Sequence, residues 1–232
     1  MSQYGFIKIE RDFIKSIPNP QDPTPIKDLS LPKKQDGISS KVLEYVSTRL
    51  NKPTLNHSLR VFFYSRAIIK DQFPQWELDE DVLLTTCLLH DLGTTDENMN
   101  ETKMSFEYYG AFKARDLVSK LTTDNDTDYA DAVCEAIIRH QDLNDKGYIT
   151  QLGLILQIST VLDNAGLEVV SKLIHSETLD LVNKEYSRDG WLGCFAQVVE
   201  RENQLKPWGH TSSLGVDEFP QLVRSNKLKY NL

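Results

Sequence analysis

Apolar residues from position 38 onward recur mostly at the spacing of amphipathic helices. Ile38, Val42 and Val46 lie on one face of a first helix, and a second helix begins after Pro53 and runs to about residue 73. The stretch WELDEDVLLTTCLLHDLG, residues 76–93, begins with acidic side chains and ends at a glycine, as helices commonly do. Further helices are predicted at 103–121, 128–142, 151–165, 176–186 and 191–204.

The pattern contains no convincing strand alternation, no hairpin signal and no internal repeat. We therefore predict an all-α bundle, and a chain of 232 residues is long enough for one sizeable core. Residues 1–37 are predicted to be a partly irregular N-terminal arm, because 17–37 carry five prolines and many polar residues. This arm is either packed on the surface or loose. The helical domain spans 38–215, and 216–232 form an irregular charged tail.

Net charge and composition exclude some classes of binding partner. The formal net charge is -8, so no global basic field exists to hold nucleic acid. No apolar run approaches the roughly 20 residues that a membrane span needs, and the first residues do not resemble a signal peptide. The three cysteines are far apart and set among apolar residues, which is typical of reduced core thiols. We expect a cytoplasmic protein, with the nucleus also compatible, that binds neither nucleic acid nor membranes.

On four separate helices a polar side chain falls on the apolar face: His57, His90, His140 and Asp163. The three histidines lie three, four or seven residues from apolar residues of their helices, and Asp163 lies on the side of Leu156, Ser159 and Thr160. A lone histidine on such a face is usually a structural core residue, and Asp163 alone could be a helix cap or an ion-pair partner. Burying ionisable groups costs several kcal/mol unless something compensates for the lost hydration.

A metal ion bound by several of these side chains would provide that compensation. His57, His90, the adjacent Asp91 and Asp163 together offer two imidazoles and two carboxylates, a ligand set for a divalent transition metal. The order His57, then His90-Asp91, then Asp163 resembles the HD-domain superfamily of metal-dependent hydrolases. This resemblance covers about residues 50–170. It implies a helical bundle with a central metal held by those four residues.

Two observations bear on the branch of that superfamily. Many HD phosphodiesterases carry a lysine where this chain has Thr94, and the helical phases of Arg115 and Arg139 point away from His140. A pocket poor in positive charge suits a small neutral substrate better than a phosphate ester. Several longer stretches are similar to the fungal cyanamide hydratases: LNHSLRVFFYSRAI, TCLLHDLGTT, TKMSFEYYGAFKA, AIIRHQDL, LGLILQISTVLDNAG and KPWGHTSSLG.

That resemblance implies hydration of cyanamide to urea, with a detoxifying or stress-response role. It implies zinc as the metal, although Fe²⁺ suits the same mixed nitrogen and oxygen ligands. The alternative is an HD phosphohydrolase acting on a nucleotide. A non-catalytic HD module is a third class, but such modules usually lack a ligand, and all four are present here.

Catalytic roles follow from a zinc-bound hydroxide that attacks the nitrile carbon, with Asp91 serving both as ligand and in catalysis. His140 is the candidate proton donor, or alternatively a fifth ligand or a group that bridges through water. Thr160 could bind the water or substrate, or its hydroxyl could bond back to the carbonyl of Leu156.

Four further residues are candidates for the pocket wall: Tyr108, Tyr109, Trp208 and His210. Aromatic residues at helical spacing are more often core, and Trp208 and His210 could instead pack on the surface. Exposed aromatics and the proline-rich arm are also reasonable interface material, so a homo-oligomer is compatible with the sequence.

Overall fold

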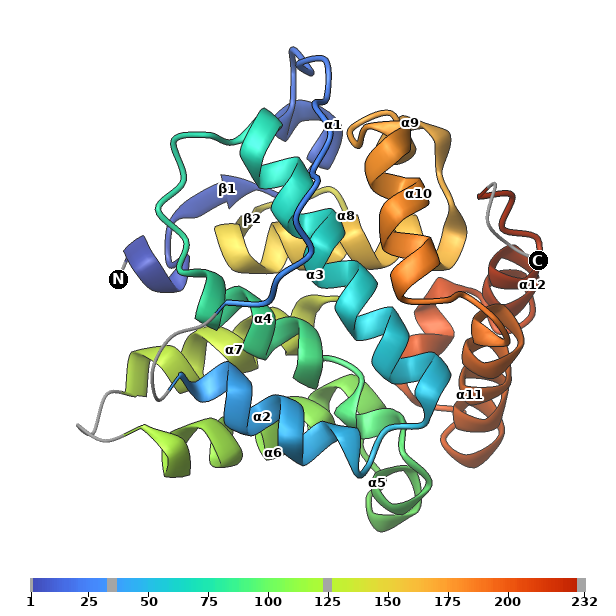
Figure 1. Ribbon diagram of the computed structural model, residues 1–232. Helices are drawn as coiled ribbons and strands as arrows, with labels where there is room; N and C mark the ends of the chain where they lie inside the picture. Colours follow the sequence, from blue (N-terminus) through green and yellow to red (C-terminus); the bar gives the residue numbers. More distant parts are fainter. Residues whose placement is uncertain (1, 33–36, 123–126, 229–232) are drawn as a thin grey trace.

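The computed structural model of the chain describes residues 2–32, 37–122 and 127–228, and within them helices dominate (Figure 1). The described α-helices are α1 Phe13–Ser16, α2 Ile38–Ser47, α3 Lys52–Gln72, α4 Glu80–Leu89, α5 Asp96–Glu101, α6 Phe106–Leu121, α7 Thr127–Arg139, α8 Gln151–Ala165, α9 Glu168–Ser171, α10 Ser176–Glu185, α11 Trp191–Leu205 and α12 Glu218–Arg224. Three 3-10 turns, η1 Ser2–Tyr4, η2 Leu92–Thr94 and η3 His210–Leu214, complete the helical elements. Every segment predicted as a helix from the spacing of apolar residues contains one, which confirms the all-α class.

Local capping explains where the site-bearing helices begin. The Asn51 side chain accepts a hydrogen bond from the backbone N–H of Thr54 at the start of α3, where Pro53 also lies in the first turn. The side chain of Thr150 accepts from Gly153 at the start of α8. This helix ends at Gly166, whose φ of 61° is the left-handed conformation that favours glycine.

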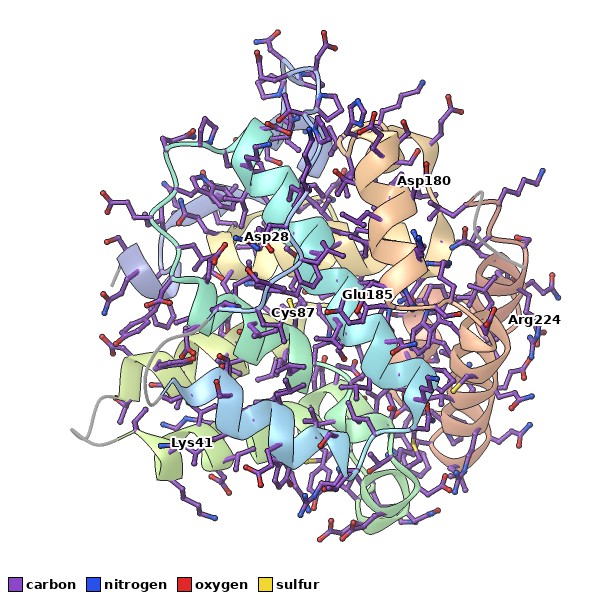
Figure 2. The ribbon with its side chains drawn as sticks, viewed as in Figure 1. Asp28, Lys41, Cys87, Asp180, Glu185 and Arg224 are labelled. Atoms are coloured by element: carbon purple, nitrogen blue, oxygen red, sulfur yellow. The ribbon has the colours of Figure 1, made fainter. Side chains whose placement is uncertain are left out.

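The long helix α3 runs through the middle of the bundle and packs against α4, α8, α10 and α11 (Figure 1). Helix α2 packs on α4, α6 on α7, and α7 on α8, and these helices share one large apolar cluster. A second, smaller apolar cluster lies between α11 and α12. Cys87 lies within the large cluster, whereas Lys41 and Arg224 lie toward the periphery (Figure 2). All three cysteines are free thiols; Cys87 and Cys134 are buried as predicted, whereas Cys194 on α11 is only partly buried, so the expectation of a core thiol is wrong there.

The structure differs from the predicted pattern in short elements. Strands β1 Lys8–Glu10 and β2 Tyr148–Thr150 form an antiparallel pair, with Ile9 opposite Ile149. Three residues are too few to show a two-residue alternation in sequence. Helix α5 lies between the helices predicted at 76–93 and 103–121, where the spacing of apolar residues predicted none. Helix α12 lies in the tail expected to be irregular, because Phe219 and Val223 bury against α11.

Residues 17–32 of the arm contain neither helix nor strand, and hydrogen bonds tie part of this stretch to the bundle, as in the surface-packed alternative. The Asp71 carboxylate on α3 accepts from the backbone N–H and the hydroxyl of Thr24, and Thr178 on α10 accepts from the N–H of Ile26. Positions 33–36 of the arm and 229–232 of the tail lie outside the described residues. Across the described ranges, no helix has the length and apolar character needed to span a membrane.

Candidate metal centre

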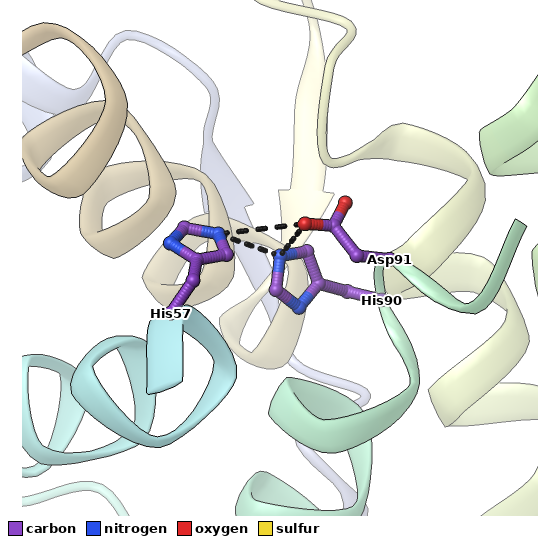
Figure 3. A group of neighbouring side chains, drawn as sticks. All are labelled: His57, His90 and Asp91. Atoms are coloured by element: carbon purple, nitrogen blue, oxygen red, sulfur yellow. Dashed lines mark hydrogen bonds and ion pairs between the residues drawn. The ribbon is translucent and has the colours of Figure 1, made fainter. Parts of the chain in front are cut away.

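Three predicted ligands converge at the centre of the bundle. His57 lies on α3, His90 caps the C-terminus of α4, and Asp91 follows it directly. The Nε2 atoms of His57 and His90 are 3.0 Å apart, and Asp91 Oδ2 lies 3.6 Å and 3.4 Å from them. Figure 3 shows one ring nitrogen of His57 directed at both His90 and Asp91, while the other points away. All three side chains are buried.

The turn that carries Asp91 is held tightly against α6. A Cβ added at Gly93 would lie 2.0 Å from the carbonyl oxygen of Phe106, so only glycine fits this approach. The Thr94 hydroxyl donates to the backbone carbonyl of Asp91 at 2.7 Å. Thr94, the neutral residue at the position of the phosphodiesterase lysine, therefore stabilises the turn.

The second ring nitrogen of each histidine defines its protonation. Nδ1 of His57 lies 2.6 Å from the Asp163 carboxylate, and Nδ1 of His90 lies 2.7 Å from the carbonyl oxygen of Cys87. Both partners can only accept, so each Nδ1 carries the proton and each Nε2 presents a lone pair. Burial lowers the pKa of His57 to about 4 and that of His90 to about 3, so both are neutral at pH 7.

This arrangement fits a cation. The two Nε2 atoms at 3.0 Å cannot hydrogen bond to each other, because neither carries a proton. Both carboxylate oxygens of Asp91 are buried and have no hydrogen-bond donor within the described part of the chain, and burial raises the pKa of this carboxyl. Two imidazole lone pairs and one carboxylate are ligands that zinc and similar divalent ions prefer, and three protein ligands leave a coordination position open.

Asp163, the fourth predicted ligand, lies on the opposite side of His57. Its carboxylate accepts from Nδ1 of His57 rather than facing His90 and Asp91, and it forms ion pairs with Arg60 and Arg188. Burial opposes ionisation of Asp163, but the guanidinium groups of Arg188 and Arg60 and the hydrogen bond from His57 outweigh burial. They hold the pKa of this carboxyl well below its ordinary value. The four predicted ligands are thus brought together only in part.

His140 and Thr160 line a cavity whose described wall includes none of the three converging ligands, and His140 links it to the ligand cluster through its ring contact with His90. The His140 ring meets the His90 ring edge-on at a centroid distance of 5.3 Å, and its Nδ1 donates to the carbonyl oxygen of Ile137 at 2.7 Å. The Thr160 hydroxyl donates to the carbonyl oxygens of Leu156 and Gln157 at 2.9 and 3.0 Å, which is the back-bonded alternative considered from the sequence. The cavity has a volume of about 180 Å³.

The cavity wall is mostly apolar and contains no lysine or arginine among the described residues. It is formed by His140, Gln141, Leu143, Thr160, Val161, Asn164, Ala165, Leu167, Leu214, Phe219 and Leu222. Arg115 and Arg139 pair with Asp131 and Glu135 on the bundle surface, as their helical phase predicted.

The four aromatic and histidine candidates for the pocket wall are not among these lining residues. Trp208 is 64% exposed and donates from Nε1 to the carbonyl oxygen of Lys103. His210 stacks on Tyr108 and forms a 2.8 Å contact with Glu107. Tyr109 lies under the ammonium group of Lys113. Aromatic spacing alone did not distinguish a cavity wall from a surface cluster.

Three residues that contact the site chemistry were not predicted. Arg60 lies three residues after His57 on the same helix face, and this spacing could have indicated it. Arg188 precedes α11, and Trp191 at the start of α11 stacks on the His57 ring at a centroid distance of 4.0 Å and an angle of 12°. Neither lies in a motif that marks a metal site.

Comparisons with known proteins agree with this geometry. A family model described as the HD domain matches residues 54–165, which include His57, His90, Asp91 and Asp163. Two proteins of Saccharomyces cerevisiae, the cyanamide hydratases DDI2 and DDI3, are each 55% identical to the chain over 231 residues, covering 100% of both sequences. This chain therefore belongs to the cyanamide hydratase family of HD-domain proteins.

Proposed function

We propose that this protein hydrates cyanamide to urea at a divalent metal held by His57, His90 and Asp91. The observation that carries the proposal is the meeting of two unprotonated Nε2 atoms with a buried carboxylate that lacks hydrogen-bond donors in the described chain. A bound cation would offset the cost of burying these groups together. Full-length identity of 55% to two cyanamide hydratases supports the substrate.

Zinc is the proposed metal, and ferrous iron is the alternative for a mixed nitrogen and oxygen site. When bound, zinc supplies Lewis acidity that lowers the pKa of a coordinated water to about 7. The protein supplies the dry surroundings, since the ligands are buried and the adjoining cavity wall is mostly apolar. We also propose a cytoplasmic location.

His140 is proposed to move the proton. Its Nδ1 donates to Ile137, so Nε2 is the ring nitrogen left to exchange a proton, and in the proposed step it acts first as a base. Nε2 takes a proton from a water molecule while the water oxygen forms a bond to the nitrile carbon. One π bond of the carbon–nitrogen triple bond breaks, and its electron pair becomes a lone pair on nitrogen. His140 then returns the proton to that nitrogen, and the resulting isourea tautomerises to urea.

Thr160 is proposed to orient cyanamide. Its hydroxyl proton is committed to the Leu156 and Gln157 carbonyls, so the oxygen toward the cavity can only accept. The amine of cyanamide offers the matching donor.

A nucleotide phosphohydrolase is supported less well. Phosphate esters need cationic groups around their oxygens, and the described cavity lining has neither lysine nor arginine. The two buried guanidinium groups near His57 are already paired with Asp163.

The test is urea release from cyanamide by the purified protein, before and after removal of metal with a chelator. We expect urea from the untreated protein, loss of activity after chelation, and recovery on addition of Zn²⁺. Release of inorganic phosphate from nucleotides is measured in parallel. Phosphate release without urea would overturn the proposal, and urea production that survives complete metal removal would overturn the metal's role.

His140→Gln tests the proton-transfer role. Glutamine keeps polarity but cannot exchange a proton near neutral pH, so we expect kcat for cyanamide to fall by about 10²- to 10⁴-fold. Zinc content, measured by atomic absorption, should equal that of the wild type, because His140 is not among the three converging ligands. A variant that loses both zinc and activity would instead identify His140 as a ligand.

A further inference from the structure

A buried charged cluster lies behind His57, and in it Asp163 is the ion-pair partner that was one of its predicted alternatives. Asp163 and Arg60 are fully buried and Arg188 is 4% exposed. Arg60 donates from Nε and Nη2 to the Asp163 carboxylate, and Arg188 forms an ion pair with Oδ1 of the same group. Burying three charged groups together costs desolvation free energy, which is recovered only when their ion pairs and hydrogen bonds are well formed.

The hydrogen bonds leave the Asp163 carboxylate without room for a metal. Oδ2 accepts from Nδ1 of His57 at 2.6 Å and from Nη2 of Arg60 at 2.8 Å, while Oδ1 accepts from Arg60 and Arg188. A carboxylate has about four lone-pair directions, and donors occupy both of its oxygens here. Nδ1 and Nε2 lie on different sides of the His57 ring (Figure 3). The imidazole therefore separates the Asp163 carboxylate, which bonds to Nδ1, from the cluster around Nε2.

We propose that Asp163 is a positioning residue and not a metal ligand. It fixes His57 as the Nδ1–H tautomer and holds its ring so that Nε2 faces the metal, as carboxylates do behind many zinc-bound histidines. Arg60 and Arg188 compensate its charge. This inference rests on the proposed metal site, and its test does not depend on cyanamide as the substrate.

The C-terminal segment, beyond the matched HD domain, contributes residues to this arrangement. Arg188, Trp191 and Asn226 all lie beyond residue 165, where the HD-domain match ends. Arg188 and Asn226 donate to the backbone carbonyl of Asp163 at 2.7 and 3.0 Å, and Trp191 stacks on His57. The segment after the matched domain therefore fixes His57 in two ways: it holds Asp163, which bonds to Nδ1, and it packs Trp191 on the face of the ring.

The deciding experiment measures metal binding to metal-free protein carrying Asp163→Asn. The Kd for Zn²⁺ is obtained by competition with a chelator, and the visible absorption spectrum is recorded at saturating Co²⁺. We expect the Kd to rise by about 10- to 100-fold, because the ring is less well oriented. The saturated Co²⁺ spectrum should match that of the wild type, because no ligand is lost.

Two controls separate this role from others. Asp91→Asn removes a proposed ligand and should change the Co²⁺ spectrum. Glu200→Gln removes a carboxylate from an exposed ion pair with Arg224 and should change neither readout. A Co²⁺ spectrum for Asp163→Asn that changes as it does for Asp91→Asn would show that Asp163 is a ligand. A Kd within twofold of the wild type would show that it does not position His57.

A measurement on the wild type remains decisive if Asp163→Asn does not fold. In the zinc-loaded protein, ¹⁵N NMR of the histidine rings should show a slowly exchanging proton on Nδ1 of His57, assigned by its loss from His57→Gln. Absence of that proton would overturn the proposal, because Asp163 could then not be its acceptor.

Discussion

Replacing His90 with alanine is expected to abolish metal retention and reduce kcat/KM for cyanamide by about 10³-fold or more. The loss follows because a bound metal contributes several kcal/mol of transition-state stabilisation, and each 1.36 kcal/mol corresponds to about tenfold in rate. The variant should still fold, because the substitution removes an unfavourable contact between two lone pairs, those on the Nε2 atoms of His57 and His90. Zinc content, urea release and circular dichroism measure the three outcomes.

His175→Asn is the matched control for this variant. His175 is the N-cap of α10, where its Nδ1 accepts from the N–H of Glu177, and asparagine can accept in the same way. Its zinc content and activity should equal those of the wild type. Full activity in His90→Ala would refute the proposed metal centre while leaving the cyanamide assignment open.

Gly93→Ala is expected to be the most disruptive of the single methyl additions near the site. The new Cβ would lie 2.0 Å from the Phe106 carbonyl oxygen and 3.2 Å from the Gly110 nitrogen, both backbone atoms of α6. Neither can move without shifting the helix, so the free energy of unfolding should fall by about 3 kcal/mol or more. Because Asp91 lies two residues earlier, zinc binding should weaken as well. Urea denaturation and zinc titration measure the two effects.

The same substitution at Gly193 provides the comparison. Gly193 lies in α11, is exposed, and an added Cβ would meet nothing within 4 Å. Alanine there should stabilise the protein by about 0.5–1 kcal/mol, because glycine is entropically unfavourable within a helix. Equal stability changes at Gly93 and Gly193 would contradict the close packing of the turn against α6.

The contrast between these glycines illustrates the limit of sequence patterns. The sequence predicted that the helix over 76–93 would stop at Gly93, but α4 ends at Leu89 with His90 as its C-cap, and Gly93 lies in η2. The backbone of α6 approaches Gly93 so closely that no side chain fits there. This requirement could not be predicted, because the two segments meet only after folding. The acidic helix α5 and helix α12 were missed for a related reason, since short helices form through tertiary packing more than through local preference.

The sequence by itself determined the helical class, the eight main helices, and the inward faces that carry His57 and His90, because the 3.6-residue period assigns each helical side chain to a face. Asp91 was predicted only as the neighbour of His90, and it lies just after α4. The sequence also indicated a neutral pocket through Thr94, Arg115 and Arg139. A helical period does not say which atom of a ring meets which partner.

Only the tertiary structure decided that Asp163 meets Nδ1 of His57 and not Nε2. It also decided that Arg188 and Trp191, more than 100 residues from His57 in the chain, complete its surroundings. The cavity beside His140 and Thr160 is likewise formed by segments distant in sequence, whereas Trp208 and His210 lie outside its lining. Local spacing placed the ligands on their helices, but long-range packing set the distances and hydrogen bonds that give each one its role.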